Sequence, residues 1–316
     1  MFRMPPAVGG MDRVEALKEN YMVARKGLGV VVAGLIGLMP VVALAGAAET
    51  AAALVADAKA LLAKADFEGA LKAYAQAAKT DSQNQDYRQQ YSVLRRVVDM
   101  RKAVDKETND EKWRGTVAGL RAFYYQNDLY GEALALDSKA HGKLKNAESA
   151  SSLAQTQLQM GRNAEAAATL SALDEKTATP QSQVLLGIAL ARQGKNDEAK
   201  AVAGKIETPK EGMPGLLYDL ACLHALTGDT AGAAALLTRC FENTPPSRVD
   251  AFKTTAKQDK DLSSMVASAD FAKSLETASK VKESACSGGS NCGSCPSKGG
   301  CSTASKSACP SEKAAK

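Results

Sequence analysis

The sequence predicts an all-α fold, a solenoid made of antiparallel helix pairs. Glycines recur at Gly161, Gly194 and Gly228, so a unit of 33 or 34 residues repeats along the chain. Each of these glycines follows an apolar stretch and precedes an alanine-rich one, as a turn between two helices requires. Ala, Leu, Lys and Glu are abundant and only 5% of the residues are aromatic, a composition that favours helix.

The first 47 residues predict export. Arg25 and Lys26 precede an uncharged apolar run at 27–44, and small residues follow at Ala45 and Ala47. A basic stretch, an apolar stretch and a small-residue cleavage motif together describe a signal peptide, here 22–47. The run has 18 residues, enough to span a bilayer, so an uncleaved anchor is the alternative.

Residues 1–21 are interpreted as an extension from a mis-called start, because Met22 would begin a compact signal. Both the cleaved and the anchored form place the rest of the chain in the periplasm or on the outer face of the inner membrane. The membrane is then a partner only through the N-terminal segment.

The helical repeats and their closing segment are expected to fill residues 48–279. In each turn, a residue with positive φ ends the first helix, and a small residue five positions later lets the second helix pack closely. One longer helix is expected over Gln85–Lys112, and Arg248–Ser279 is expected to close the last unit. The expected helix pairs occupy 51–84, 114–146, 147–179, 180–213 and 214–247.

These units resemble the tetratricopeptide repeat family. One unit matches its pattern at Leu186-Gly187, Gly194 and Ala199, and the first unit matches at Phe67, Ala70, Tyr74 and Ala77. The repeats are degenerate: Ser82 stands where the family has proline, and an aromatic position is taken by Leu170, Ala203 and Leu237. The resemblance implies a right-handed superhelix whose concave groove is lined by the first helix of each unit.

The resemblance also implies that a peptide or protein partner binds in this groove. Carried over by position, the groove residues are Tyr125, Gln126, Gln155, Gln159 and Arg192. The alternative is that these side chains are simply solvated helix residues. The expected function is a non-enzymatic scaffold in the cell envelope.

Several function classes are not supported by the sequence. The two histidines, His141 and His224, lie at positions that suit a helix end and packing, and no catalytic set accompanies them. The formal net charge is +5, but most of the excess lies near the two ends, and a nearly neutral repeat body argues against nucleic acid. Cys222 and Cys240 occupy packing positions as buried thiols, and a disulfide between them is the alternative.

Residues 280–316 form a separate segment that carries the alternative function, metal or thiol handling. From 284 onward it has no Val, Ile, Leu, Met or aromatic residue, so it is expected to be disordered. Its cysteines are Cys286, Cys292, Cys295, Cys301 and Cys309, of which Cys292 and Cys295 form a C-x-x-C. These thiols are expected to form local disulfides or to bind a soft cation such as Cu(I) or Zn(II), with a merely flexible end as the alternative.

This segment predicts a measurable redox or metal state. Protein freshly isolated from the envelope should show fewer than five reactive tail thiols, or a bound soft metal, because an oxidising compartment favours disulfides and thiolates bind such ions. Thiol titration with and without reductant, beside metal analysis of protein purified without added metal, measures both. Five free tail thiols without metal would contradict both forms.

Overall fold

In a computed structural model of the chain, the structure describes residues 39–209 and 212–282. Every regular element in these two ranges is a helix, which confirms the all-α class. The expected extension at 1–21, most of the expected signal peptide and the five tail cysteines lie outside the described residues and stay predictions.

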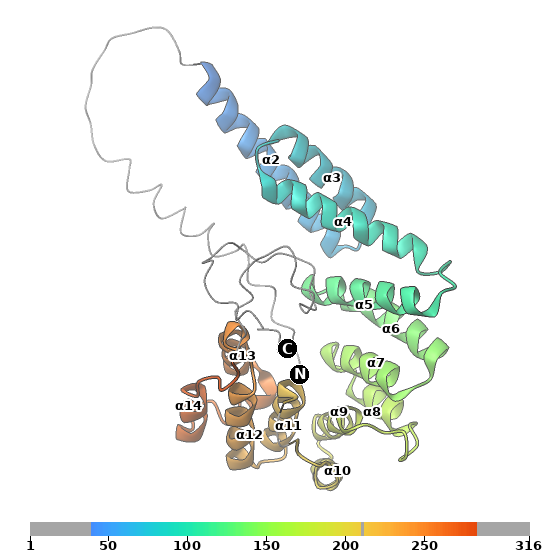
Figure 1. The fold of residues 1–316 in the computed structure, drawn as a ribbon, viewed down its shortest axis with the longest axis vertical. Coiled ribbons are helices and arrows are strands. Elements are labelled where there is room, and N and C mark those ends of the chain that lie inside the picture. Colours follow the sequence, from blue (N-terminus) through green and yellow to red (C-terminus); the bar gives the residue numbers. More distant parts are fainter. Residues whose placement is uncertain (1–38, 210–211, 283–316) are drawn as a thin grey trace, which may run out of the picture.

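The helices form successive pairs that follow a curved path (Figure 1). The pairs are α2 (Met39–Ala63) with α3 (Phe67–Thr80), α5 (Asp110–Gln126) with α6 (Tyr130–Leu144), α7 (Ala147–Gln159) with α8 (Asn163–Ser171), α9 (Pro180–Ala191) with α10 (Asn196–Ala203), and α11 (Pro214–Leu226) with α12 (Thr230–Glu242). From α5 onward, the first helices of the pairs, α5, α7, α9 and α11, line the inner side of the curve, and their partners lie on the outer side (Figure 1). The predicted solenoid of helix pairs is therefore confirmed.

The turns between paired helices share one backbone geometry. Gly161, Gly194 and Gly228 have φ values of +73°, +79° and +90°, in the left-handed region where glycine is favoured. Ala65 and Asp128 adopt the same conformation at the equivalent positions, with φ values of 59° and 55°. The two N-terminal turns thus keep the geometry without the glycine that marks it in the sequence.

Helix α4 (Gln85–Ala103) is shorter than the expected helix over Gln85–Lys112. The chain turns after Ala103, and α5 already begins at Asp110, four residues before the expected unit boundary. Asn109 explains the new start, because its side-chain oxygen accepts a hydrogen bond of 2.9 Å from the Lys112 amide and caps α5. Helix α4 packs on α3, so the N-terminal part of the solenoid is a three-helix layer (Figure 1).

Helix α2 begins inside the apolar N-terminal run and continues without a break through the expected cleavage motif at Ala45 and Ala47. Among residues 48–63 of this helix, the first fully buried side chain is that of Ala51, close to the predicted start of the repeat body. No helix within residues 39–209 and 212–282 is both long and apolar enough to cross a membrane.

The closing segment follows α12 directly. It consists of α13 (Pro246–Gln258), the short 3₁₀ helix η1 (Lys260–Leu262) and α14 (Ala269–Leu275). Phe252, Leu262, Met265 and Phe271 from this segment are almost completely buried against the last helix pair. The segment therefore covers the apolar end of the solenoid, as expected of a cap.

Most of the buried apolar side chains of the described residues fall into two clusters. One extends from Ala58 to Ala140 over helices α2 to α6, and the other from Ala154 to Phe271 over α7 to α14. The boundary between them lies where α6 meets α7. Polar side chains take over at this boundary, and they form the site described below.

The close helix contact at the repeated alanine can be tested at Ala199. This residue of α10 is 0% exposed, so Ala199→Trp should overpack the helix pair and lower the free energy of unfolding by about 1–3 kcal/mol or more. Ala201→Trp, on the exposed face of the same helix, is the matched control and should change little. Urea denaturation followed by circular dichroism measures both; equal stability of the two variants would show that Ala199 is not a close contact.

Candidate functional site

A buried carboxylate joins three helices at the boundary between the two apolar clusters. Asp137 of α6 is only 1% exposed. The Nε atom of Arg121, on α5, donates to both carboxylate oxygens at 3.1 Å. The Thr156 hydroxyl, on α7, donates to Oδ2 at 2.6 Å. These charge-assisted bonds compensate the cost of removing the carboxylate from water.

The network continues to Tyr125 with a defined direction. Because the Thr156 proton is directed at Asp137, the Tyr125 hydroxyl donates to Thr156 Oγ1 at 2.6 Å. Arg121 Nη2 donates to the Tyr125 hydroxyl at 2.9 Å and to Gln155 Oε1 at 2.9 Å. The carbonyl oxygen of the Gln155 side chain thus faces Arg121, and its amide group is left to bond elsewhere.

Burial shifts the pKa of the acidic members of this network upward. Desolvation raises the pKa of the Asp137 carboxyl, and the charge of Arg121 and the bond from Thr156 oppose the shift. Desolvation likewise raises the pKa of Tyr125 to about 12, against the opposing effect of Arg121, whose guanidinium carbon lies 4.4 Å from the ring centroid. Tyr125 is therefore a neutral donor at physiological pH.

A cavity of about 460 Å³ opens beside this network, between α5, α6 and the start of α7. Arg121, Tyr125, Asp137 and Gln155 from the network are part of its wall. The apolar part of the wall comes from Trp113, Val117, Ala118, Ala122, Tyr130 and Leu144. This combination of aromatic walls and a few oriented polar groups is typical of a ligand-binding cavity.

A second cavity of about 490 Å³ lies on the other side of α7. It extends to α9 and α11 through Gln181 and Asp219, whose side chains form a hydrogen bond of 2.7 Å. Glu148, Ser152 and Gln155 line both cavities. They are spaced i, i+4 and i+7, so they lie on one face of α7, and this face forms a wall that the two cavities share.

Three of the five groove residues expected from the sequence lie together. Tyr125, Gln126 and Gln155 line the first cavity, whereas Gln159 and Arg192 line neither cavity. The Nε2 atom of Gln159 is buried without a hydrogen-bond partner among the described residues.

Arg192 instead holds the closing segment. Its Nε and Nη2 atoms donate to the two carboxylate oxygens of Asp261 at 2.9 and 2.6 Å, and both side chains are largely buried. Its Nη1 atom donates to the Leu158 carbonyl at 3.1 Å. This bidentate pair ties the last segment to the fourth helix pair.

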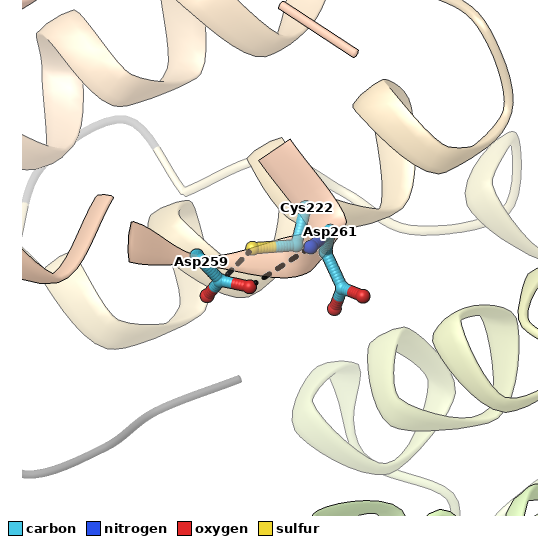
Figure 2. Close-up of side chains that lie close together, drawn as sticks. All are labelled: Cys222, Asp259 and Asp261. Carbon is cyan, nitrogen blue, oxygen red and sulfur yellow. Dashed lines mark hydrogen bonds between the residues drawn. The ribbon is translucent and has the colours of Figure 1, made fainter. Parts of the chain in front are cut away.

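Asp261 belongs to a cluster with Cys222 and Asp259 that has the residue types of a metal site (Figure 2). Asp259 Oδ1 accepts from the Asp261 amide at 3.0 Å, and Oδ2 accepts from the Cys222 thiol at 3.9 Å (Figure 2). Asp259 Oδ2 also accepts from the Tyr218 hydroxyl at 3.0 Å.

The donor set of this cluster fits a metal ion poorly. Each carboxylate oxygen already accepts a hydrogen bond, and Arg192 supplies the positive charge beside Asp261. Burial raises the pKa of the Cys222 thiol well above its ordinary value, whereas a metal needs the thiolate. The cluster therefore joins η1 to α9 and α11.

The remaining candidates from the sequence have structural contacts. His224 Nδ1 lies 2.7 Å from Asp229 Oδ2 at the start of α12, and His141 Nδ1 lies 3.1 Å from the Ser149 hydroxyl. Cys222 and Cys240 are buried thiols that are not joined in a disulfide.

The sequence analysis did not identify Asp137 or Arg121 as site residues. The sequence does contain a signal for Asp137, because Ala133, Asp137 and Ala140 share one helix face at i, i+4 and i+7, and both alanines are buried. A charged residue in the buried phase of a helix needs a partner. Nothing in the sequence identifies Arg121 as that partner.

Comparison with known proteins adds little to this geometry. No model of a known protein family matches the sequence, and no curated protein matches it. A solved structure described as YrrB, a TPR protein with an unusual peptide-binding site, is 18% identical over 67% of this chain and 97% of that one, with a TM-score of 0.31. The solenoid assignment thus depends on the helices of this chain.

The buried pair predicts a pH-dependent stability change. Arg121→Met keeps the aliphatic chain but leaves Asp137 unpaired, which should lower the free energy of unfolding by about 3 kcal/mol at pH 7. Without Arg121 the folded-state pKa of Asp137 rises further above its unfolded value, so the cost applies above that pKa and disappears as the carboxyl is protonated. Lowering the pH from 7 toward 4 should therefore reduce the difference in the free energy of unfolding between Arg121→Met and the native protein.

Urea denaturation at both pH values measures this difference. The double variant Arg121→Met with Asp137→Leu is the control, because it removes the carboxylate and should lose the pH-dependent part. A difference that stays constant with pH would show that Asp137 is not the group responsible.

Proposed function

We propose that the protein is an exported, non-enzymatic scaffold that binds a peptide or protein partner on the inner side of its solenoid. The observation that carries the proposal is the first cavity, beside the buried Asp137 network. Residues of α5 and α7, which lie on the inner side of the curve, line this cavity, and its walls offer apolar surface together with oriented polar groups.

The size and chemistry of the cavity support a side chain of a partner as its occupant. A volume of about 460 Å³ holds an aliphatic or aromatic anchor together with adjoining main chain. The Gln155 amide, oriented by Arg121, is available to donate to a main-chain carbonyl. Tyr125 contributes ring surface while its hydroxyl stays bonded to Thr156.

Export is part of the proposal and is supported by the sequence alone. The apolar run at 27–44 with Arg25 and Lys26 before it has the layout of a signal peptide or an N-terminal anchor. Helix α2 carries the chain from this run directly into the repeat body. The partner is accordingly expected in the cell envelope.

A second function, metal or thiol handling, depends on Cys292-Gly293-Ser294-Cys295 and the three other cysteines of the tail. This segment lies outside the described residues and is separate in sequence from the groove. Both functions are compatible with one chain, with the repeats acting as the holder.

The groove function can be tested by filling the cavity. Ala122 is exposed on α5 and lines the cavity, so Ala122→Phe should occupy the anchor volume without disturbing the core. Random dodecapeptides displayed on phage and selected on the full chain should bind the Ala122→Phe variant about tenfold more weakly, a loss equivalent to about 1.4 kcal/mol.

Ala201→Phe, a substitution of the same size on the exposed face of α10, is the matched control and should leave binding unchanged. Peptide binding that is equal in all three proteins would place the partner site elsewhere. A selection that enriches no sequence on the native chain would contradict the proposed function.

A further inference from the structure

The charged side chains that line the first cavity include more negative than positive groups. Asp128, Asp137 and Glu148 contribute three carboxylates, and Arg114 and Arg121 contribute two guanidinium groups. Asp137 and Arg121 neutralise each other in the buried network. The charges that a ligand meets at the edge of the cavity are therefore those of Arg114, Asp128 and Glu148.

These three groups differ in what surrounds them. Arg114 lies near Asp110 and helps to lower the pKa of that carboxyl, although Lys143 has the larger effect. Asp128 accepts a hydrogen bond of 2.8 Å from the Tyr130 hydroxyl. Glu148 is exposed, and no hydrogen bond or ion pair joins its side chain to any other residue within 39–209 and 212–282.

Glu148 lies between the two cavities, because it is part of the wall of both. In the second cavity the charged lining residues are Glu148 and Asp219, and no lysine or arginine is among them. The N-terminal end of α7, equivalent to roughly half a positive charge, offsets only part of this negative charge. An acidic ligand would bring like charges together at this point.

We propose that the segment bound in this groove is basic, with a Lys or Arg beside Glu148 and an adjacent aliphatic or aromatic side chain in the first cavity. The apolar anchor would contact Trp113, Tyr125 and Tyr130, which supply the aromatic surface. This inference rests on the proposed function and adds the chemistry of the partner to it.

The chain also contains a basic segment of its own, at 283–316, with Lys298, Lys306, Lys313 and Lys316. That segment has no aliphatic or aromatic side chain larger than Ala and Pro, so it has no anchor for the aromatic cavity. A separate partner with both features fits better.

The experiment uses the full chain and a random dodecapeptide library displayed on phage. Selection on the native protein should enrich peptides in which Lys or Arg adjoins an aliphatic or aromatic residue. Resynthesised peptides should bind about threefold more weakly to Glu148→Gln and about tenfold more weakly to Glu148→Lys, because an exposed ion pair contributes modestly and its reversal costs more. Higher salt should weaken binding to the native protein.

Two features of the chain sharpen this test. Trp113 is the only tryptophan and lines the cavity, so peptide binding should change its emission. Glu198→Lys is the matched control, because Glu198 is an exposed glutamate in the first turn of α10 and lines neither cavity. It should leave peptide affinity unchanged.

Different failures have different meanings. Enrichment of Asp or Glu, an absence of charge bias, or an affinity unaffected by Glu148→Lys would overturn the basic partner while leaving a peptide-binding groove. Enrichment that appears only after all four tail lysines are changed to serine (Lys298→Ser, Lys306→Ser, Lys313→Ser, Lys316→Ser) would assign the groove to the tail and also overturn it. No enrichment on any of these proteins would overturn the proposed function as well.

Discussion

The burial of one carboxylate, Asp137, sets the arrangement of the middle of this solenoid. An ionised group can stay inside a protein only if other groups replace its water, and here the replacements come from Arg121 on α5 and Thr156 on α7. The two apolar clusters end on either side of this point. The first helices α7, α9 and α11 pack closely against one another, whereas α5 and α7 are joined through this polar network, and the first cavity lies beside it.

The fold was predictable because its signals are local. A turn that needs positive φ and a small residue five positions later are properties of a short stretch of chain, and Gly194 with Ala199 shows both in sequence and in structure. Local sequence signals fail at three positions of this chain. Ala65 and Asp128 adopt the glycine conformation without being glycine, and Asn109 begins α5 earlier than the repeat length suggests.

The site was predictable only in part, because its contacts join helices that are far apart in sequence. Position within the repeat placed Tyr125 and Gln155 on the inner side, and both line the cavity. The same reasoning cannot show that a side chain on that side is already bonded within the chain. Arg192 is an example, since its partner Asp261 lies 69 residues later in a closing segment that has no repeat pattern.

The closing segment limits where a partner can bind. Cys222 of α11, the first helix of the last pair, contacts Asp259 through its side chain (Figure 2). Tyr218 of the same helix also bonds to Asp259, and Arg192, at the end of α9, holds Asp261. The chain thus covers part of this region itself, and these polar groups are already bonded before any partner arrives. What is left open is the stretch from α5 across α7 toward α9, where Gln155 and Glu148 have bonding capacity that the described residues do not use. Polar side chains on the inner helices are therefore bonded to the closing segment at one end of the solenoid, whereas in the middle they remain available to a partner.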